Sequence, residues 1–193
     1  MERKKRISPA GNKRGGQLTN HHIVPSSRFD EPEYAKFKND RKNEVAVIGV
    51  WHNKYHSLFY NMTPTEVLFF LENTFWRGQT AWIDTYANVD IARKRKKWRY
   101  HPPIIVSSGK NPGQRGNQLI EMRIIPIARL FEQDYRSYRD DKTNKVLVVK
   151  SWAVNYKMLF GEMTPPEVLY FLEFTFWGGQ TKWLDAYAHN RPE

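Results

Sequence analysis

The chain contains the same sequence twice. When it is shifted by 101 residues, positions 14–92 align with positions 115–193 without a gap, and about 36 of the 79 aligned residues are identical. The longest match pairs MTPTEVLFFLENTFWRGQTAWIDTYA with MTPPEVLYFLEFTFWGGQTKWLDAYA. Each copy holds roughly 80 residues, a size that is marginal for an isolated domain. We therefore expect two similar units that bury apolar surface against each other, as the chains of a homodimer do.

The repeat and the composition divide the chain into four parts. We expect a flexible basic arm over residues 1–16, a first copy over 17–89, a linker over 90–113 and a second copy over 114–193. The linker is assigned from a stretch rich in Arg, Lys, Pro and Gly. Because the second copy repeats the pattern of the first, the local structure of one copy predicts that of the other.

The first copy begins with the pattern of a strand hairpin. A short strand is expected over residues 17–24, since Pro25 cannot donate a hydrogen bond to a ladder. A loop or short irregular helix should follow over residues 26–42. The apolar, β-branched run VAVIGV over residues 45–50 then predicts a buried strand. The fold class is therefore α+β.

Helices are expected over the rest of the copy. The spacing of apolar residues turns helical at Trp51, and Thr63-Pro64-Thr65-Glu66 has the form of a capping box that opens a second, largely buried helix. The second copy repeats this box as Thr164-Pro165-Pro166-Glu167. A last short helix should turn three side chains inward: Trp82, Ile83 and Tyr86.

The charge predicts a polyanionic partner. The net charge is +11 with a pI near 9.8, which favours nucleic acid. Residues 1–100 hold 19 Lys and Arg against 10 Asp and Glu, whereas residues 101–193 hold 12 against 10. Basic runs over residues 3–6 and 93–99 concentrate the excess, although such runs can also be solvated tails or linkers. The basic excess therefore lies mostly in the first half.

The composition also excludes several kinds of protein. There is no cysteine, so disulfide frameworks and thiolate metal sites are excluded and a metal must use His, Asp or Glu. The N-terminal MERKKR is not followed by the apolar core of a secretory signal. No apolar run approaches the roughly 18 residues of a membrane span. We expect an intracellular protein that does not enter a membrane.

Four histidines distinguish the first copy from the second. His21, His22, His52 and His56 have no histidine counterparts; the second copy places Met122, Arg123, Ala153 and Lys157 at the four aligned positions. On a helix, His52 and His56 lie one turn apart and can present two ring nitrogens to one ion. His21 on the preceding strand could supply a third. Three ligands with an open position are typical of a catalytic divalent ion.

The neighbouring histidine has a different expected role. Adjacent residues on a strand point to opposite faces, so His21 and His22 should not share one task. With an unperturbed pKa of about 6.5, His22 would be partly neutral near pH 7 and able to accept a proton. We therefore expect His22 to be the general base beside the metal.

At these spacings the first copy resembles the HNH nuclease family, in the version with paired leading histidines and two closing histidines found in the colicin DNases. The pattern here is His21-His22, then Asn43, then eight residues to His52 and three to His56. The resemblance covers about residues 18–60. The interval from His22 to Asn43 is several residues longer than in the colicin enzymes, which adds loop.

The resemblance implies a fold, a cofactor and a reaction. It implies two tandem ββα-metal units with extra C-terminal helices, packed as a pseudo-dimer, of which only the first is active. One divalent ion (Zn, Mg, Mn or Ni) would be held by His21, His52 and His56, while His22 activates water and Asn43 orients the loop that carries it. Cleavage would give a 5′-phosphate and a 3′-hydroxyl, one strand at a time, with DNA favoured over RNA.

Alternatives remain for the individual residues. The histidines could be satisfied core residues or the ligands of a structural zinc, but the second copy keeps the scaffold without them. Asn144 persists in that copy, so Asn43 is expected to hold the hairpin loop through side-chain to backbone hydrogen bonds. Residues expected to contact nucleic acid are Arg28, Lys54, Arg93, Lys94, Arg95, Lys96, Lys97, Arg123 and Lys157.

Two of these expectations have open alternatives. Arg28 recurs as Arg129, so a structural ion pair is as good an interpretation as a phosphate contact. Arg123 and Lys157 replace a base and a ligand with fixed charges, which either grip phosphate or reflect drift.

Three function classes follow. The first is a metal-dependent endonuclease, monomeric with an internal pseudo-dimer or weakly homodimeric. The second is a nucleic-acid-binding or ribonucleoprotein module that keeps the fold and a structural metal without cutting. The third, a toxin of colicin type, would need a delivery segment and an inhibitor partner, neither of which the sequence contains.

Overall fold

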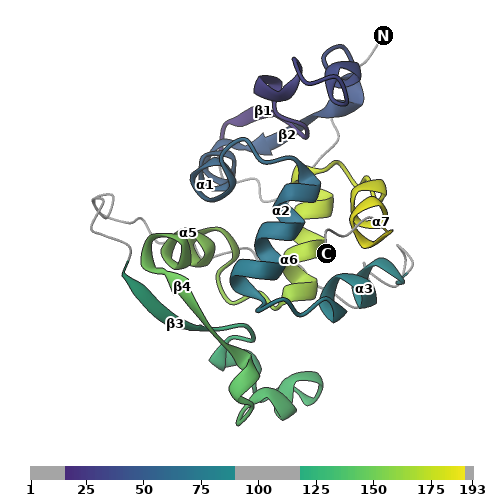
Figure 1. The fold of residues 1–193 in the computed structure, drawn as a ribbon. Coiled ribbons are helices and arrows are strands. Elements are labelled where there is room, and N and C mark those ends of the chain that lie inside the picture. Colours follow the sequence, from purple (N-terminus) through teal and green to yellow (C-terminus); the bar gives the residue numbers. More distant parts are fainter. Residues whose placement is uncertain (1–15, 90–117, 190–193) are drawn as a thin grey trace.

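The two halves of the chain contain the same elements in the same order. The computed structural model describes residues 16–89 and 118–189 (Figure 1). The expected arm and linker lie almost entirely outside these residues. The first half consists of β1 (Leu18–His22), β2 (Glu44–Ile48), α1 (Gly49–Phe59), α2 (Pro64–Phe70) and α3 (Ala81–Ala87). The second consists of β3 (Leu119–Arg123), β4 (Lys145–Val149), α5 (Lys150–Phe160), α6 (Pro165–Phe171) and α7 (Lys182–His189). The α+β class is confirmed.

Each half begins with a two-stranded antiparallel sheet. In the first, β1 pairs with β2 so that His21 lies opposite Val45. Three short 3-10 turns fill the connection, as expected for an irregular segment. The strand predicted over residues 45–50 is present as β2, but its predicted burial is wrong: β2 ends at Ile48 and only Val47 of its five residues is buried. A sheet covered on one face leaves alternate side chains half exposed, so continuous hydrophobicity does not mean continuous burial here.

The second helix of each half begins where the sequence predicts, whereas α1 begins at Gly49, before the predicted Trp51. Thr63 and Glu66 form the capping box of α2, and Thr164 and Glu167 form that of α6. Both helices continue into one π-helical turn, Leu71–Phe75 and Leu172–Phe176, which the apolar pattern does not predict. In α3, Ile83 and Tyr86 are buried as expected, while Trp82 is only half-buried.

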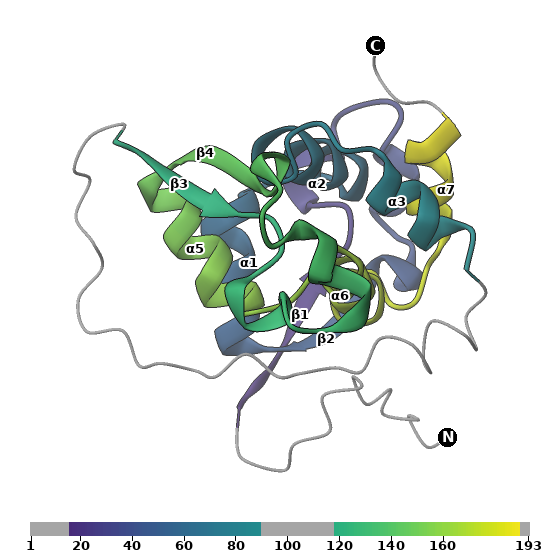
Figure 2. The ribbon, with the colours of Figure 1, turned by 90° about the horizontal axis from the view of Figure 1, so that it is seen from below.

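Contacts between the halves occur in reciprocal pairs. Tyr55 stacks on Phe176 with ring centroids 4.4 Å apart, and the aligned pair Tyr156 and Phe75 stacks at 4.4 Å. The last helices follow the same rule, because α3 packs on α6 while α7 packs on α2. Figure 2 shows α1 beside α5 and α3 beside α7, so these helices also meet their own counterparts.

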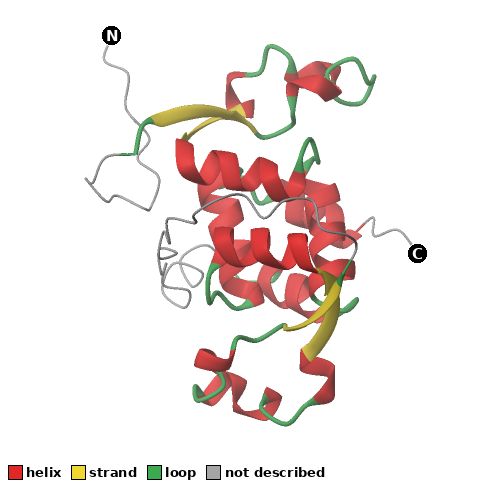
Figure 3. Ribbon diagram, turned by 90° about the vertical axis from the view of Figure 1, so that its left-hand side faces the viewer, coloured by secondary structure: helices red, strands yellow, loops and turns green. Residues whose placement is uncertain are grey.

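Buried polar groups repeat this reciprocity. The Tyr187 hydroxyl donates to Glu72 Oε2 at 2.6 Å, and the aligned Tyr86 hydroxyl donates to Glu173. At the edge, Gln79 donates to the Thr143 carbonyl, and Gln180 donates to the Lys42 carbonyl. One continuous hydrophobic core includes residues of both halves. The two hairpins lie at opposite ends of this shared helical layer (Figure 3).

None of the helices in residues 16–89 and 118–189 has the length and apolar character needed to cross a bilayer.

Candidate metal centre

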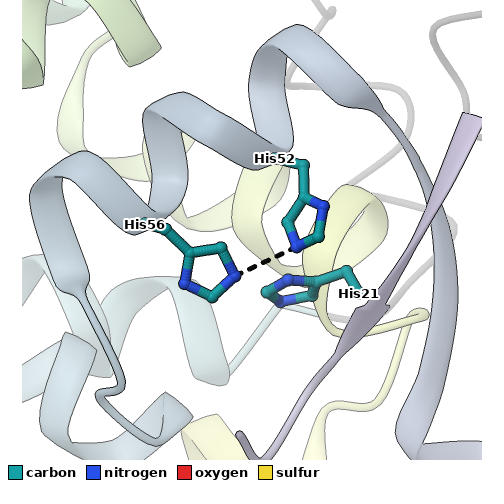
Figure 4. A group of neighbouring side chains, drawn as sticks. All are labelled: His21, His52 and His56. Carbon is teal, nitrogen blue, oxygen red and sulfur yellow. Dashed lines mark hydrogen bonds between the residues drawn. The ribbon is translucent and has the colours of Figure 1, made fainter. Parts of the chain in front are cut away.

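Three of the four histidines converge at one end of the molecule. His21 extends from β1, and His52 and His56 extend from one face of α1 (Figure 4). Each offers a ring nitrogen, and these nitrogens all lie within 4.8 Å of one another. Because α1 starts immediately after β2, the turn from strand to helix brings the two helical histidines over the strand that carries His21.

His21 is enclosed by aromatic rings and lacks polar partners. Its side chain is 1% exposed and contacts Tyr55 and, from the other half, Phe176. Both of its ring nitrogens are buried without a hydrogen-bond partner in the described residues. Burial, reinforced by the neighbouring His52 and His56, holds the pKa of His21 well below its usual range. The ring is therefore neutral at physiological pH, which is the form that binds metals.

The contacts of His52 are compatible with the tautomer whose outer nitrogen binds a metal. Thr19 Oγ1 donates to the Val47 carbonyl at 3.3 Å and lies 2.8 Å from His52 Nδ1. When the one hydrogen of the hydroxyl goes to the Val47 carbonyl, Thr19 Oγ1 accepts from His52 Nδ1–H. Nε2 of the neutral ring then carries a lone pair. Thr19 thus has the position of a group that fixes the tautomer of a metal ligand.

His56 has the same arrangement through a different partner. Its Nδ1 lies 2.7 Å from the carbonyl oxygen of Tyr60. A carbonyl can only accept, so His56 Nδ1 carries the hydrogen and Nε2 carries the lone pair. The Nε2 atoms of His52 and His56 face each other at 3.0 Å. Without an ion, the two rings share a hydrogen bond (Figure 4), with His52 Nε2–H donating to His56 Nε2; with an ion, both Nε2 atoms present lone pairs to it.

These residues fit a bound divalent ion. Two nitrogens on one tetrahedral zinc ion are separated by roughly 3.3 Å, given Zn–N bonds of about 2.0–2.1 Å. The observed 3.0 Å between His52 and His56 is close to that value. An ion in this position would also satisfy a ring nitrogen of His21, which otherwise stays buried without a partner. The three imidazoles therefore have the chemistry of a three-ligand site.

His22 lies beside this cluster and is accessible. It follows His21 on β1, its side chain is 40% exposed, and its Nε2 is 3.8 Å from Glu44 Oε1. Its ring also contacts Phe29 edge to face. Burial, His56 and His22 together lower the pKa of His52. The structure thus separates a buried His21 from an exposed His22, as their expected roles require.

The asparagine of the motif supports the hairpin loop. Asn43 is buried; its Oδ1 accepts from Val24 N at 2.8 Å and its Nδ2 donates to the Val24 carbonyl at 3.0 Å. In the second half Asn144 bonds Ile125 in the same way. Asn43 therefore ties the end of β1 to the start of β2, which agrees with the expected holding of the loop.

The residues expected to contact nucleic acid have different surroundings. Arg28 forms ion pairs with Glu31 and Glu66, and Arg129 forms the aligned pairs, so the ion-pair alternative is observed. Lys54 Nζ lies 3.6 Å from Met158 Sδ at the contact between α1 and α5. Arg123 is half-buried and donates to the Arg139 carbonyl, while Lys157 is exposed. Residues Arg93, Lys94, Arg95, Lys96 and Lys97 lie outside the described residues.

The aligned site in the second half has lost all of its histidines. Met122 and Ala153, at the positions of His21 and His52, are buried in the core. The support has changed as well: Ile120 replaces Thr19 and Gly161 replaces Tyr60. Motif spacing did not identify Thr19 or Tyr60. The signal was nevertheless present, because both differ between the copies at positions next to the ligands.

No family model, curated protein or solved structure matches the chain.

Proposed function

We propose that the protein is a metal-dependent endonuclease of HNH type. The first half would be the active ββα-metal unit, and the second half a degenerate copy that completes the fold. The observation that carries this proposal is the convergence of three imidazoles whose nitrogens lie within 4.8 Å of one another, with Thr19 Oγ1 and the Tyr60 carbonyl beside the Nδ1 atoms of His52 and His56. A core role for these histidines would leave His21 buried without a partner.

The residues have distinct tasks in the proposed reaction. His21, His52 and His56 would hold the ion, which when bound polarises the scissile phosphate and stabilises the leaving oxygen. His22 would take the proton from the attacking water, and Glu44 lies close enough to steady the imidazolium that results. Asn43 keeps the strand that carries both histidines in register with the loop.

The reciprocal contacts support a tandem pseudo-dimer. In an isologous interface every contact occurs twice: a contact between two residues is repeated between their aligned residues. The pairs Tyr55–Phe176 and Tyr156–Phe75 have this form. The second half then supplies Phe176 to the wall around His21, so the proposed active unit depends on its partner half. With one centre per chain, we expect cleavage of one strand at a time.

The charge supports nucleic acid as the substrate. The half that holds the histidines also holds most of the basic excess. DNA is proposed as the substrate, on the resemblance to the colicin DNases, with products that carry a 5′-phosphate and a 3′-hydroxyl.

Nicking of supercoiled plasmid tests the proposal. Purified protein should convert supercoiled DNA to open circles with added Zn, Mg, Mn or Ni, and a chelator should stop the conversion. Binding to plasmid without any metal-dependent nicking would instead identify a non-cutting module with a structural metal. Replacing His52 by Ala is the control for a contaminating nuclease, since contaminating activity would survive it.

A further inference from the structure

One residue beside the metal centre adopts a backbone conformation suited to glycine. Tyr60, which ends α1, has φ 52° and ψ −120°. The aligned residue of the second half, Gly161, has φ 59° and ψ −124° at the end of α5. Residues with a Cβ are strained in this region, whereas glycine enters it freely. The first half therefore keeps a tyrosine where the same turn is made by glycine elsewhere in the chain.

The metal centre uses the backbone of Tyr60, not its side chain. The Tyr60 carbonyl accepts from His56 Nδ1 at 2.7 Å, and the Tyr60 amide donates to the His56 carbonyl at 3.0 Å. A glycine at this position would supply both groups equally well. Neither the turn nor the tautomer of His56 therefore explains the tyrosine.

The Tyr60 side chain also has no visible structural task. It is 65% exposed and makes no hydrogen bond or ring contact with residues in the described ranges. Arg77, the other non-glycine residue there with positive φ, offers a contrast, since its guanidinium donates to the Lys142 carbonyl across the contact between the halves. The Arg77 side chain thus makes a hydrogen bond across this contact, whereas Tyr60 places an aromatic ring in solvent on the residue whose carbonyl contacts His56.

We propose that the Tyr60 ring is a stacking platform for a base of the nucleic acid, next to the phosphate held at the histidine centre. The inference rests on the proposed function. An exposed aromatic face four residues from His56 on the same helix end is suited to an unstacked base, because every base presents an apolar π face. Such stacking tolerates different sequences, so Tyr60 would position the strand without reading it.

Tyr60→Gly tests the platform, because this change should not harm the fold. The variant should melt at the wild-type temperature or slightly above it, since glycine relieves the backbone strain, and it should keep the wild-type metal content. Its affinity for DNA should fall about 5- to 150-fold, the range for loss of one base-stacking aromatic. Tyr60→Phe should bind within about twofold of wild type, because stacking needs the ring and not the hydroxyl.

Two readouts separate stacking from a structural role. In a His22→Ala background that prevents cleavage, an oligonucleotide carrying 2-aminopurine should show quenched fluorescence when that base reaches the ring, and Tyr60→Gly should abolish the quenching. In protein that keeps His22 and therefore cleaves DNA, Tyr60→Gly should raise the KM for nicking. The matched control is Gly161→Tyr, which should lower the melting temperature and leave affinity and KM unchanged.

Each outcome decides one question. If wild type nicks DNA and Tyr60→Gly has the same KM and quenching, the platform is rejected while the nuclease stands. If Tyr60→Gly lowers the melting temperature by many degrees, the tyrosine is structural and the platform is rejected. If Tyr60→Phe is as weak as Tyr60→Gly, the hydroxyl and not the ring makes the contact, which also rejects stacking. Wild type that neither binds nor nicks DNA rejects the proposed function together with the platform.

Discussion

The two halves have one scaffold but only one of them has a polar centre. Capping boxes, hairpin asparagines, Arg–Glu ion pairs and interface aromatics recur in both. At the centre, buried His21 contrasts with buried Met122, and His52 contrasts with Ala153. The supporting residues Thr19 and Tyr60 have changed along with the ligands, to Ile120 and Gly161. The fold therefore does not need this centre, which agrees with the proposal that the histidines serve chemistry.

The largest effect is expected when a proposed metal ligand of the first half is replaced by the residue at the aligned position of the second half. His52→Ala copies Ala153 and removes one of three ring nitrogens, so the ion should be lost and nicking should fall to background. Plasmid nicking and metal analysis of the purified variant measure both. Full nicking by His52→Ala would place the catalytic ligands elsewhere and break the contrast between the halves.

Replacing the general base should be nearly as damaging to the rate but harmless to the site. His22→Ala should keep one ion and normal DNA affinity while the nicking rate falls roughly 10²- to 10⁴-fold. Single-turnover nicking with a metal assay separates the two effects. Arg123→Ala, at the aligned position, is the control and should leave the rate unchanged. If His22→Ala loses its metal, the roles of His21 and His22 are exchanged.

The support of His52 offers a sharper test of the tautomer argument. Thr19→Val removes the hydroxyl that lies 2.8 Å from His52 Nδ1 and imitates the β-branched Ile120. Metal affinity should fall about 10- to 100-fold, as for other groups that orient a ligand. Competition titration against a chelator measures it, and Thr19→Ser should restore the affinity. Equal affinity in Thr19→Val would mean that the bond to His52 does not prepare the site.

Replacing the buried His21 should stabilise the metal-free protein while it removes a proposed metal ligand. His21→Met copies Met122 and removes two buried nitrogens that have no partner in the described residues. The metal-free protein should gain about 1–3 kcal/mol, which for a chain of this size raises the melting temperature by about 2–4 °C per kcal/mol. Thermal melts in chelator measure the gain, and Met122→His should show the reverse loss. A loss of stability in His21→Met would make His21 a structural residue.

The smallest effect is expected from removing the positive charges of Arg123 and Lys157 in the second half. If Arg123 and Lys157 grip phosphate, changing both to Ala should weaken DNA binding modestly and reduce the salt dependence by up to about two phosphate contacts. The catalytic step should not change. Binding titrations at several salt concentrations measure this slope, and equal slopes would leave drift as the explanation of both charges.

The sequence predicted the parts of the fold that depend on local chemistry. The capping boxes at Thr63 and Thr164 and the helical spacing of His52 and His56 are properties of a few neighbouring residues, and all are observed. The exposed face of β2 was not predicted, because burial depends on which elements cover a strand. The π-helical turns were not predicted either, since apolar spacing does not distinguish them from α-helix.

The supports of the candidate site were hidden for a similar reason. Thr19 is distant from His52 in sequence, and only the hairpin register and the start of α1 bring them to 2.8 Å. The positive φ of Tyr60 cannot be predicted from its side chain, which disfavours it. Both positions could still have been found by comparing the copies at residues next to the ligands, where Ile120 and Gly161 differ from them.

The position of the ion tests the central claim most directly. Anomalous diffraction from crystals of the protein loaded with zinc would locate the metal without reference to activity. The account predicts one anomalous peak per chain, bonded to His21, His52 and His56 at about 2.0–2.1 Å, and no peak beside Met122, Ala153 and Lys157. A stoichiometric peak at any other position, or no peak between the three histidines after loading, would contradict it.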